Sequence, residues 1–323
     1  MDHRDLLLPA VALIVVAGAL EWALSAWQGQ TRSVGLMLAN GWVALVEQAV
    51  GLLVYTGLLG VYAAMSSFVP WVWPADHWAS WVVSFVLVDL AFYAYHRFSH
   101  QTALGWSVHV VHHQSPDLNL PAALRNSPLG GALQFVFQLP LLLLGVPPVC
   151  WIVCKSINPL LQLFLHTEHV GRVPLLEGWV NSPAAHRVHH GLQEAYQGRN
   201  LGGVLVVWDR LFGTWTVATE APRYGAGETD LDPVRTQLRP LARLASAVWA
   251  GGPRVLWGPP VPSPGRPEAP LDPSATRLVV ASLHLALGAV VLVALATGSL
   301  PVWGGLPLLM LGVSTAPRVL GVS

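Results

Sequence analysis

Residues 78–100 read WASWVVSFVLVDLAFYAYHRFSH, an apolar run that ends in two histidines four positions apart. Because a hydrocarbon core of about 30 Å takes roughly 20 helical residues, residues 78–95 predict a membrane-spanning helix that leads directly into His96 and His100. Side chains four positions apart lie one turn apart on the same helix face, so both imidazoles can point at one place. The stretch therefore predicts a membrane helix with metal ligands at its end.

Two more histidine clusters follow, HVVHH at 109–113 and HRVHH at 186–190. Leaving so many imidazoles unligated in an apolar chain would cost about 1 to 3 kcal/mol for each unpaired nitrogen. A structural zinc site needs four ligands, so a larger set argues for two metal ions. All-histidine ligation suits iron, zinc, copper or nickel, and spacing alone does not separate them. The predicted ligands are His96, His100, His109, His112, His113, His186, His189 and His190.

The composition is that of an integral membrane protein. The chain is 53% hydrophobic and 11% charged, with a mean hydropathy of +0.51, whereas soluble domains average about 25% charged residues. Seventeen basic residues balance seventeen acidic ones and no basic tract is present, so we expect no nucleic-acid partner. Cys150 and Cys154 lie in an apolar stretch, so no disulfide framework is expected.

The apolar segments predict an all-α fold, a polytopic membrane helical bundle with a cytoplasmic, histidine-rich cap for two metals. A hairpin turn is expected at Gly145-Val-Pro-Pro. Besides residues 78–95, the predicted spans are residues 6–27, 36–65, 129–146, 149–166, 277–296 and 300–316.

Arginine placement predicts which side the histidines face. Basic residues gather in the segments that flank the histidine clusters, whereas residues 66–77 at the opposite ends of the spans carry none. By the positive-inside rule the histidines face the cytoplasm, and we expect a multi-pass protein of a bacterial inner membrane. Lys155 falls within a span, and we expect its ammonium to snorkel to the membrane surface; a polar cavity is the alternative. Residues 234–250 predict a short helix that either lies on the membrane interface or covers the catalytic region.

The three clusters, in this order and with a membrane hairpin between the second and third, resemble the fatty acid hydroxylase superfamily, also called the sterol desaturase family. The resemblance covers most of residues 85–216, in the segments DLAFYAYHRFSH, HVVHHQSPDLNLPAALRNS, HTEHVG, NSPAAHRVHHG and RNLGGVLVVWDRLFGTW. Together with the later WGPP, these segments look most similar to the alkylglycerol monooxygenase-like bacterial branch.

The spans and the resemblance together divide the chain into four parts. N-terminal transmembrane helices occupy residues 1–77, and a fatty acid hydroxylase-like catalytic domain occupies 78–216. A Pro/Gly-rich cytoplasmic segment at 217–276 and a C-terminal transmembrane hairpin at 277–323 complete the expected organisation.

The resemblance implies that the eight cluster histidines are metal ligands and that His166 of HTEH is a ninth. His169, one helical turn further on, is either another ligand or a neighbour that supports one. The two ions are implied to be iron in the working enzyme, with zinc or other metals in some purified members, and O₂ is the implied co-substrate. No side chain beyond the metal centre is expected to act catalytically.

Several polar residues have predicted supporting roles. Asp89 lies two helical turns before His96, and a carboxylate in a membrane helix requires a partner. It accepts the N–H of a ligand imidazole, or it pairs with Arg97 or another polar group. Glu168 is placed similarly. The other polar positions that match the family segments, and that we expect to brace loops around the metals, are Asn119, Arg125, Asn181, Asn200 and Asp209.

The resemblance implies a membrane di-iron oxygenase, an oxidoreductase that hydroxylates an unactivated C–H bond of a fatty acyl, alkyl, sterol or isoprenoid chain. A lipid desaturase on the same site is the first alternative. A membrane metal-binding or metal-transport protein is the second, although it would place ligands along a path through the bilayer. A zinc hydrolase is the third, and it would recruit a carboxylate base and fewer ligands.

Electrons for such a reaction have to come from another molecule. The chain holds no CxxCH haem motif and no cysteine set for an iron–sulfur cluster. We therefore expect a separate reductase, ferredoxin or cytochrome, or, by analogy with the branch named above, a pterin.

Overall fold

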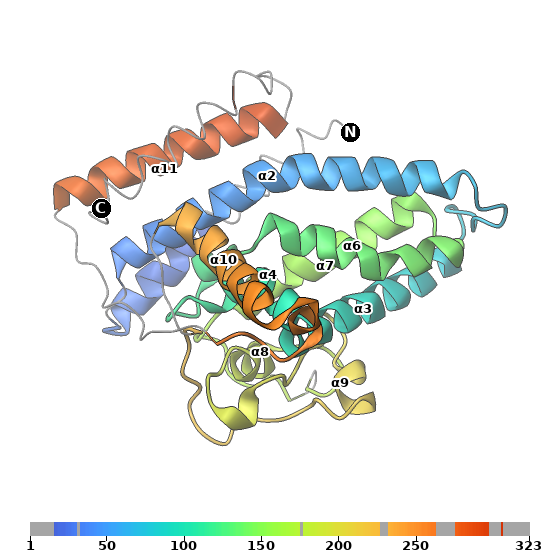
Figure 1. The fold of residues 1–323 in the computed structure, drawn as a ribbon. Coiled ribbons are helices and arrows are strands. Elements are labelled where there is room, and N and C mark those ends of the chain that lie inside the picture. Colours follow the sequence, from blue (N-terminus) through green and yellow to red (C-terminus); the bar gives the residue numbers. More distant parts are fainter. Residues whose placement is uncertain are drawn as a thin grey trace.

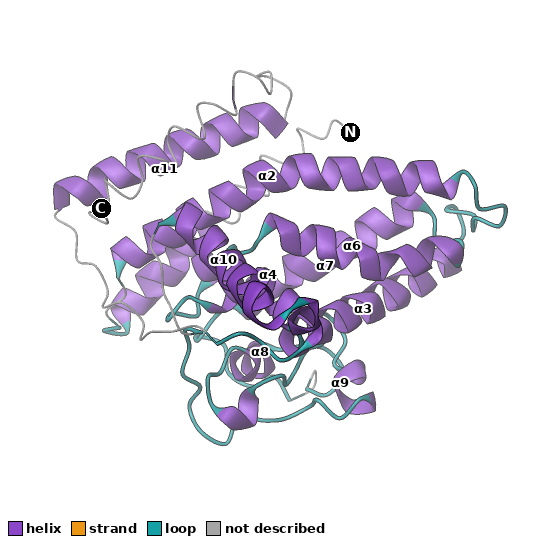
Figure 2. Ribbon diagram, in the orientation of Figure 1, coloured by secondary structure: helices purple, strands orange, loops and turns teal. Residues whose placement is uncertain are grey.

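The described part of the chain is helical, which confirms the predicted all-α class. The structure is a computed structural model that describes residues 16–30, 33–174, 177–226, 232–262, 275–296 and residue 305. Within these residues the helices are joined by loops, with one isolated antiparallel bridge between Val180 and Leu205 (Figure 2). The longer helices are α2 (Val34–Ser66), α3 (Trp78–Gln101), α4 (Ala103–His113), α6 (Pro128–Leu143), α7 (Pro148–Leu165), α10 (Pro233–Gly251) and α11 (Ala275–Ala296). The short elements are α5 (Leu120–Ala123), α8 (Pro183–His189), η1 (Glu194–Tyr196), α9 (Val207–Leu211) and η2 (Pro253–Trp257).

Three of these helices, α2, α3 and α7, are long and apolar enough to cross a membrane. They correspond to the spans predicted at 36–65, 78–95 and 149–166, and the shorter apolar helix α6 corresponds to 129–146. Helix α11 covers the span predicted at 277–296. Of the first predicted span, residues 16–27 are helical and the remainder lies outside the described residues, as does nearly all of 300–316.

Helices α2, α3, α6 and α7 lie side by side and share one apolar core (Figure 1). At its centre the rings of Tyr62 and Trp151 stack with their centroids 4.4 Å apart, and Phe135 meets Trp151 edge-on. Aromatic contacts of this kind add about 0.5–1.5 kcal/mol each beyond the burial of their area. The bundle therefore gives the helix ends fixed positions.

The hairpin between α6 and α7 turns where the sequence predicts it. Gly145 adopts φ +88°, a conformation that disfavours other residues, and a Cβ there would collide with the carbonyl of Trp71. The Trp73 amide donates to the Gly145 carbonyl at 2.9 Å, which ties this turn to the loop between α2 and α3. This end of the bundle lies opposite the end that carries the histidines (Figure 1).

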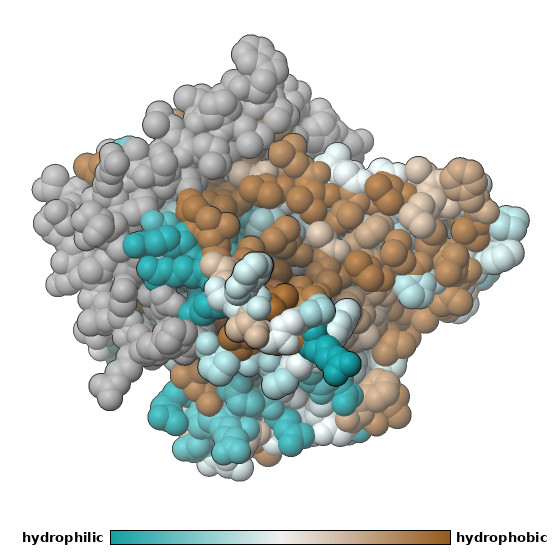
Figure 3. Space-filling model, in the orientation of Figure 1, coloured by the Kyte–Doolittle hydropathy of each residue, from teal (hydrophilic) through white to brown (hydrophobic). Residues whose placement is uncertain are grey.

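The polar part of the protein forms a cap at the other end of the bundle. Helices α4 and α8 and the loops up to residue 226 build it, and α10 packs across α4. Figure 3 shows apolar residues gathered over α2, α3 and α6 and mostly hydrophilic residues over the region around α8. The separation of the two surfaces fits a bundle in the bilayer with a cap outside it.

Two predictions about single elements need comment. Helix α10 spans residues 233–251 and packs on α4, so it covers the catalytic region, yet its outer face carries exposed apolar residues as an interfacial helix does. The expectation that Lys155 snorkels to the membrane surface is wrong. Its ammonium lies over the ring of Tyr55 in α2, 4.5 Å from the centroid, because Glu47 and Tyr55 form a polar contact inside the bundle.

Candidate metal centre

Four helix ends bring the histidines together. His96 and His100 lie in the last turns of α3, and Thr102 ends that helix and caps α4 by accepting the Gly105 amide at 3.1 Å. His166 follows the last residue of α7. Helix α8 starts at Pro183 after the cap Ser182, a common arrangement at helix N-termini, and presents the third cluster.

The nine predicted ligands form two groups in which one nitrogen of every ring lies within 4.8 Å of the others in its group. The rings of His113 and His190 stack across the boundary, 4.3 Å between centroids, so the groups adjoin. The five-histidine group consists of His96, His100, His109, His113 and His189. The four-histidine group consists of His112, His166, His186 and His190.

Each HxxHH motif supplies both groups. In HVVHH the first and last histidines join the five-histidine group and the middle one, His112, joins the other. In HRVHH the assignment is reversed, so that only His189 joins the five-histidine group. A cluster in the sequence is therefore not one site in space, and adjacent histidines straddle the two groups.

Backbone carbonyls fix the tautomers of four rings. The Nδ1 atoms of His96 and His189 donate to the carbonyls of Leu201 and Arg199 at 2.8 and 3.0 Å. Those of His112 and His166 lie 3.0 and 2.6 Å from the carbonyls of Arg125 and Gln162. A carbonyl only accepts, so Nδ1 carries the proton and Nε2 of each neutral ring presents a lone pair.

The Nε2 atoms of the rings face one another across each group. Those of His96 and His109 lie 3.0 Å apart, and those of His166 and His186 lie 3.2 Å apart. Among the described residues, the buried Nε2 atoms of His100 and His189 have no hydrogen-bond partner. Imidazole nitrogens that gather so closely, two of them buried without a partner, fit a metal in each group.

Burial keeps the rings in the neutral form that binds metals. It lowers the pKa of His112 to about 4 and that of His189 to about 3. The pKa values of the other rings on α4 and α8 and of His166 lie well below the usual histidine value for the same reason. Desolvation penalises the charged imidazolium and leaves the lone pair available at neutral pH.

Asp89 does not accept an imidazole N–H, so that expectation is corrected. Its carboxylate accepts the backbone amides of Val204 and Leu205 at 2.9 and 3.0 Å and the indole N–H of Trp208 at 2.9 Å. The Asn158 amide adds a further contact at 3.3 Å. The two loop amides and the Trp208 indole occupy the carboxylate, so Asp89 holds the loop rather than a histidine ring.

Asp209 holds the same loop from its other side. Its two oxygens accept the amides of Leu201 and Gly202, both at 2.7 Å, and the Thr214 hydroxyl donates to it at 2.6 Å. Because the carbonyl of Leu201 accepts the His96 proton, one peptide unit connects the Asp209 carboxylate to a ring of the five-histidine group. Asp209 thus braces the loop whose Leu201 carbonyl contacts His96, and its supporting role at a metal stays a prediction.

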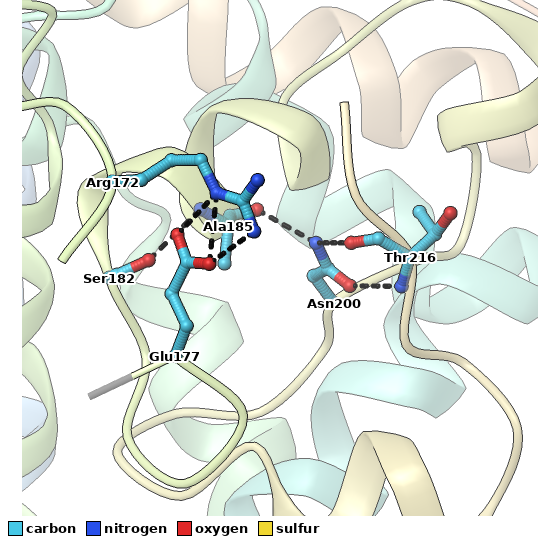
Figure 4. A network of polar contacts seen from close by, with 6 residues as sticks. All are labelled: Arg172, Glu177, Ser182, Ala185, Asn200 and Thr216. Carbon is cyan, nitrogen blue, oxygen red and sulfur yellow. Dashed lines mark hydrogen bonds and ion pairs between the residues drawn. The ribbon is translucent and has the colours of Figure 1, made fainter. Parts of the chain in front are cut away.

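Asn200 shapes the segment that supplies two of these carbonyls. It adopts φ +52°, which asparagine tolerates better than most residues. Its side-chain amide donates to the carbonyls of Ala185 and Thr216 at 3.0 and 2.9 Å and accepts the Thr216 amide, as Figure 4 shows. The carbonyls on either side of Asn200 are those that accept from His189 and His96.

Arg125 supports the four-histidine group and is fully buried. Its guanidinium donates to the Val111 carbonyl at 3.2 Å, to Asn40 Oδ1 at 2.8 Å and to Gln114 Oε1 at 3.1 Å. Asn40 and Gln114 were not singled out from the sequence. A polar asparagine inside the apolar span 36–65 is a signal that could have found the first of them.

The remaining predicted supporting residues lie farther from the rings. Asn119 caps α5 by accepting the Ala122 amide at 2.9 Å, and Asn181 donates to the Gly202 and Gly203 carbonyls at 2.8 and 3.2 Å. His169 lies outside both groups, and its Nε2 is 3.0 Å from the Ser25 hydroxyl. Glu168 is exposed and joins neither group.

The fold and the site together define a class: a helical membrane protein with a histidine metal centre at one end of its bundle. The family model "Fatty acid hydroxylase" matches residues 81–214, the segment that carries all nine histidines. This match and the relatives described next support the fatty acid hydroxylase superfamily, as the sequence motifs indicate.

The relatives of this chain are named as lipid-modifying enzymes. It is 32% identical over 227 residues to human alkylglycerol monooxygenase, covering 64% of this chain and 51% of the relative. It is 30% identical over 289 residues to alkylglycerol monooxygenase of Xenopus tropicalis, covering 83% of this chain and 63% of the relative. Ornithine lipid hydroxylase OlsE of Rhizobium tropici is 29% identical over 147 residues, 44% of each chain. The chain thus spans between half and two thirds of the length of the first two relatives, and no solved structure matches it.

Proposed function

We propose that this protein is a membrane di-iron monooxygenase that hydroxylates an unactivated C–H bond in the chain of a lipid. The observation that carries the proposal is the pair of adjoining all-histidine groups, in which four rings have their Nε2 lone pairs fixed by carbonyls. Neutral nitrogen ligands of this kind suit iron that changes its oxidation state.

One iron would be held by each group, with His96, His100, His109, His113 and His189 around the first and His112, His166, His186 and His190 around the second. When bound, the two ions supply the oxidising power that C–H hydroxylation draws from O₂. The balanced reaction takes R–H, O₂, two electrons and two protons to R–OH and water. Zinc can replace iron in a purified sample, because imidazole suits both.

The protein's own contribution is to hold the rings still. The carbonyls of Gln162, Arg199 and Leu201 keep their ring protons on Nδ1, and the Asp209 carboxylate fixes the Leu201 peptide. Such outer contacts set ring orientation and ligand basicity. No other side chain of the centre is assigned a catalytic part.

A lipid substrate is supported by the apolar bundle beside the centre and by the names of the relatives, which are an alkylglycerol monooxygenase and an ornithine lipid hydroxylase. The same names favour hydroxylation over desaturation. Crowding of all nine histidines at one end of the bundle argues against a metal-transport path, which would place ligands along the bilayer normal.

The arginine distribution supports a cytoplasmic position for the cap and an inner-membrane location in a bacterium. The proposed organisation has N-terminal transmembrane helices at 1–77 and a catalytic domain at 78–216. A cytoplasmic segment at 217–276 and a C-terminal transmembrane hairpin at 277–323 follow. Electrons would come from a separate reductase, ferredoxin, cytochrome or pterin that docks on the cap.

The test begins with metal content. Anaerobically purified protein is expected to hold two irons per chain and to give the Mössbauer spectrum of paired ferrous sites. Comparative lipidomics of cells with and without the chain should then reveal a lipid that gains the mass of one oxygen atom. A protein that takes up a single zinc and no iron, in cells whose lipids are unchanged, would overturn the proposal. Loss of two hydrogens instead of gain of oxygen would identify a desaturase.

A further inference from the structure

The five-histidine group opens to the outside at one ring. Eight of the nine histidines are buried, whereas His100 is partly exposed. A cavity of about 270 Å³ lies against it, lined also by Trp106, Gln197, Ala226 and residues 260–262. Because His100 belongs to the five-histidine group, this cavity, the His100 cleft, adjoins the centre.

The walls of the His100 cleft are fastened to the helices that carry the ligands. The Ala103 amide at the start of α4 donates to the Gly258 carbonyl at 2.8 Å. The Ala226 amide donates to the His113 carbonyl, also at 2.8 Å. The ring of Trp257 lies 6.1 Å from that of Phe98, which sits between the two histidines of α3. The cleft is therefore a fixed part of the centre rather than a gap between unattached loops.

We propose that the His100 cleft receives the hydrocarbon chain of the substrate, and that Trp106 and Val261 determine which chain fits. This inference rests on the function proposed above and names the place where that substrate meets the metals. The lining combines the apolar side chains of Trp106, Ala226 and residues 260–262 with polar groups that include His100 and Gln197. Since small-molecule pockets measure roughly 300–1,000 Å³, the cleft accommodates a chain segment and leaves the polar end of a lipid outside.

The surroundings of the cleft indicate that its occupant comes from the bilayer. Trp257, three residues before the lining residue Pro260, is 66% exposed, and Trp249 near the end of α10 is 94% exposed. Leu238 on the outer face of α10 is 56% exposed. Exposed tryptophans beside apolar helix faces are typical of the membrane interface.

Helix α10 also connects this interfacial face to the cleft. A small cavity between α4 and α10 is lined by Leu244 of α10 and shares Trp106 and Val261 with the His100 cleft. Trp106 and Val261 therefore lie between the residues of α10 that line the small cavity and the His100 cleft.

The decisive experiment compares two variants that introduce the same side chain. Val261→Trp fills the cleft, whereas Val234→Trp adds the same bulk on the outer face of α10, away from the cleft. Iron-loaded proteins are placed in phosphatidylethanolamine and phosphatidylglycerol vesicles that contain a phospholipid with a diazirine at its chain end. After illumination, the labelled peptides are identified by mass spectrometry, and iron content and lipid oxidation are measured in parallel.

In the wild-type protein we expect labelling of peptides that contain Trp106 and residues 258–262. Val261→Trp should reduce this labelling and lipid oxidation by about tenfold or more at unchanged iron content, because an added clash rejects a ligand that the cavity would otherwise admit. Val234→Trp should change neither. Val261→Ala, which widens the cleft without adding bulk, should shift oxidation toward branched or bulkier chains and keeps the inference testable if the tryptophan variant folds poorly.

The outcomes separate this inference from the proposed function. Lipid oxidation that persists in Val261→Trp, with labels confined to the outer faces of α2, α3 and α7, would contradict substrate binding in the His100 cleft. The proposed oxygenase activity would still stand. Labelling of the cleft in a protein that oxidises no lipid would overturn the enzyme and leave a lipid-binding cleft. Cleft labelling by a water-soluble diazirine alcohol in preference to the phospholipid would overturn the bilayer route.

Discussion

The two histidine groups lie side by side but differ in how they are enclosed and held. The five-histidine group reaches the surface at His100 and depends on the loop around Asn200, whereas every ring of the four-histidine group is buried. The four-histidine group depends instead on the carbonyls of Arg125 and Gln162, next to the bundle. The difference suggests a division of labour in which substrate approaches the first group while the second is shielded from solvent.

The largest expected effect comes from removing a ligand in each group. His112→Ala leaves three histidines in its group and should lose one of two irons, with lipid oxidation falling about 10³-fold or more. His100→Ala leaves four histidines and should retain both irons. Metal analysis of membrane-inserted protein checks both statements. Two irons and full activity in His112→Ala would remove that residue from the ligand set.

Loss of the buried guanidinium tests the enclosed group. Arg125→Met leaves Asn40, Gln114 and the Val111 carbonyl without their donor, and we expect the free energy of unfolding to fall by about 3 kcal/mol or more. Thermal unfolding in detergent measures this loss. Arg172→Met is the control, because its exposed guanidinium pairs with Glu177, and neither residue belongs to a histidine group. Equal melting temperatures for the two variants would contradict the assigned role.

A change on the other side tests the open group alone. In Asp209→Asn an amide nitrogen can face the N–H of Leu201 or Gly202, which disturbs the peptide that holds His96. We expect the metal affinity of the five-histidine group to fall about 10- to 100-fold while the other group is unaffected. A chelator should then release one metal much faster than the second. The control variant Glu194→Gln should leave the rates of metal release unaltered. Parallel weakening of both metals would show that the groups are not separately supported.

The smallest effect concerns pH. The folded pKa values of His112 and His189, about 4 and about 3, lie below the unfolded value of about 6.5, so the unfolded chain binds more protons throughout this interval. The stability of the metal-free protein is therefore complete above about pH 6.5 and declines as the pH falls toward 3–4. Both rings should take up their protons only well below pH 6.5. Ring signals in an NMR titration of the metal-free protein measure this, and protonation near the ordinary histidine pKa would contradict the burial argument.

Helix periodicity and histidine spacing made much of this predictable. The run at 78–100, the hairpin turning at Gly145 and the pairing of imidazoles within each of the three clusters follow from local rules that operate within one or two helical turns. The family resemblance added His166, which stands alone in the sequence and has no partner at helical spacing except His169.

The assignment of rings to groups was not predictable in the same way. In HVVHH, His112 and His113 lie on either side of His109 around the helix, and only the packing of α8 and the end of α7 against α4 decides which group each joins. The hydrogen bonds from His96 and His189 to the carbonyls of Leu201 and Arg199 are equally unpredictable, since every residue has a carbonyl. Asp89 was misjudged because its partners are loop amides more than a hundred positions away. Long-range packing, not composition, sets these contacts.

The interleaving of the HxxHH motifs constrains the order in which the protein is made. His112 precedes the α6–α7 hairpin in the chain, whereas its companions His166, His186 and His190 follow it. Neither group is complete until synthesis has passed residue 190 and the hairpin has entered the bilayer. A metal that binds at this stage would cross-link distant parts of the chain. Each cross-link closes a long loop and so lowers the conformational entropy of the incompletely folded chain. Metal supply, on this view, becomes a checkpoint in biogenesis as well as a condition for catalysis.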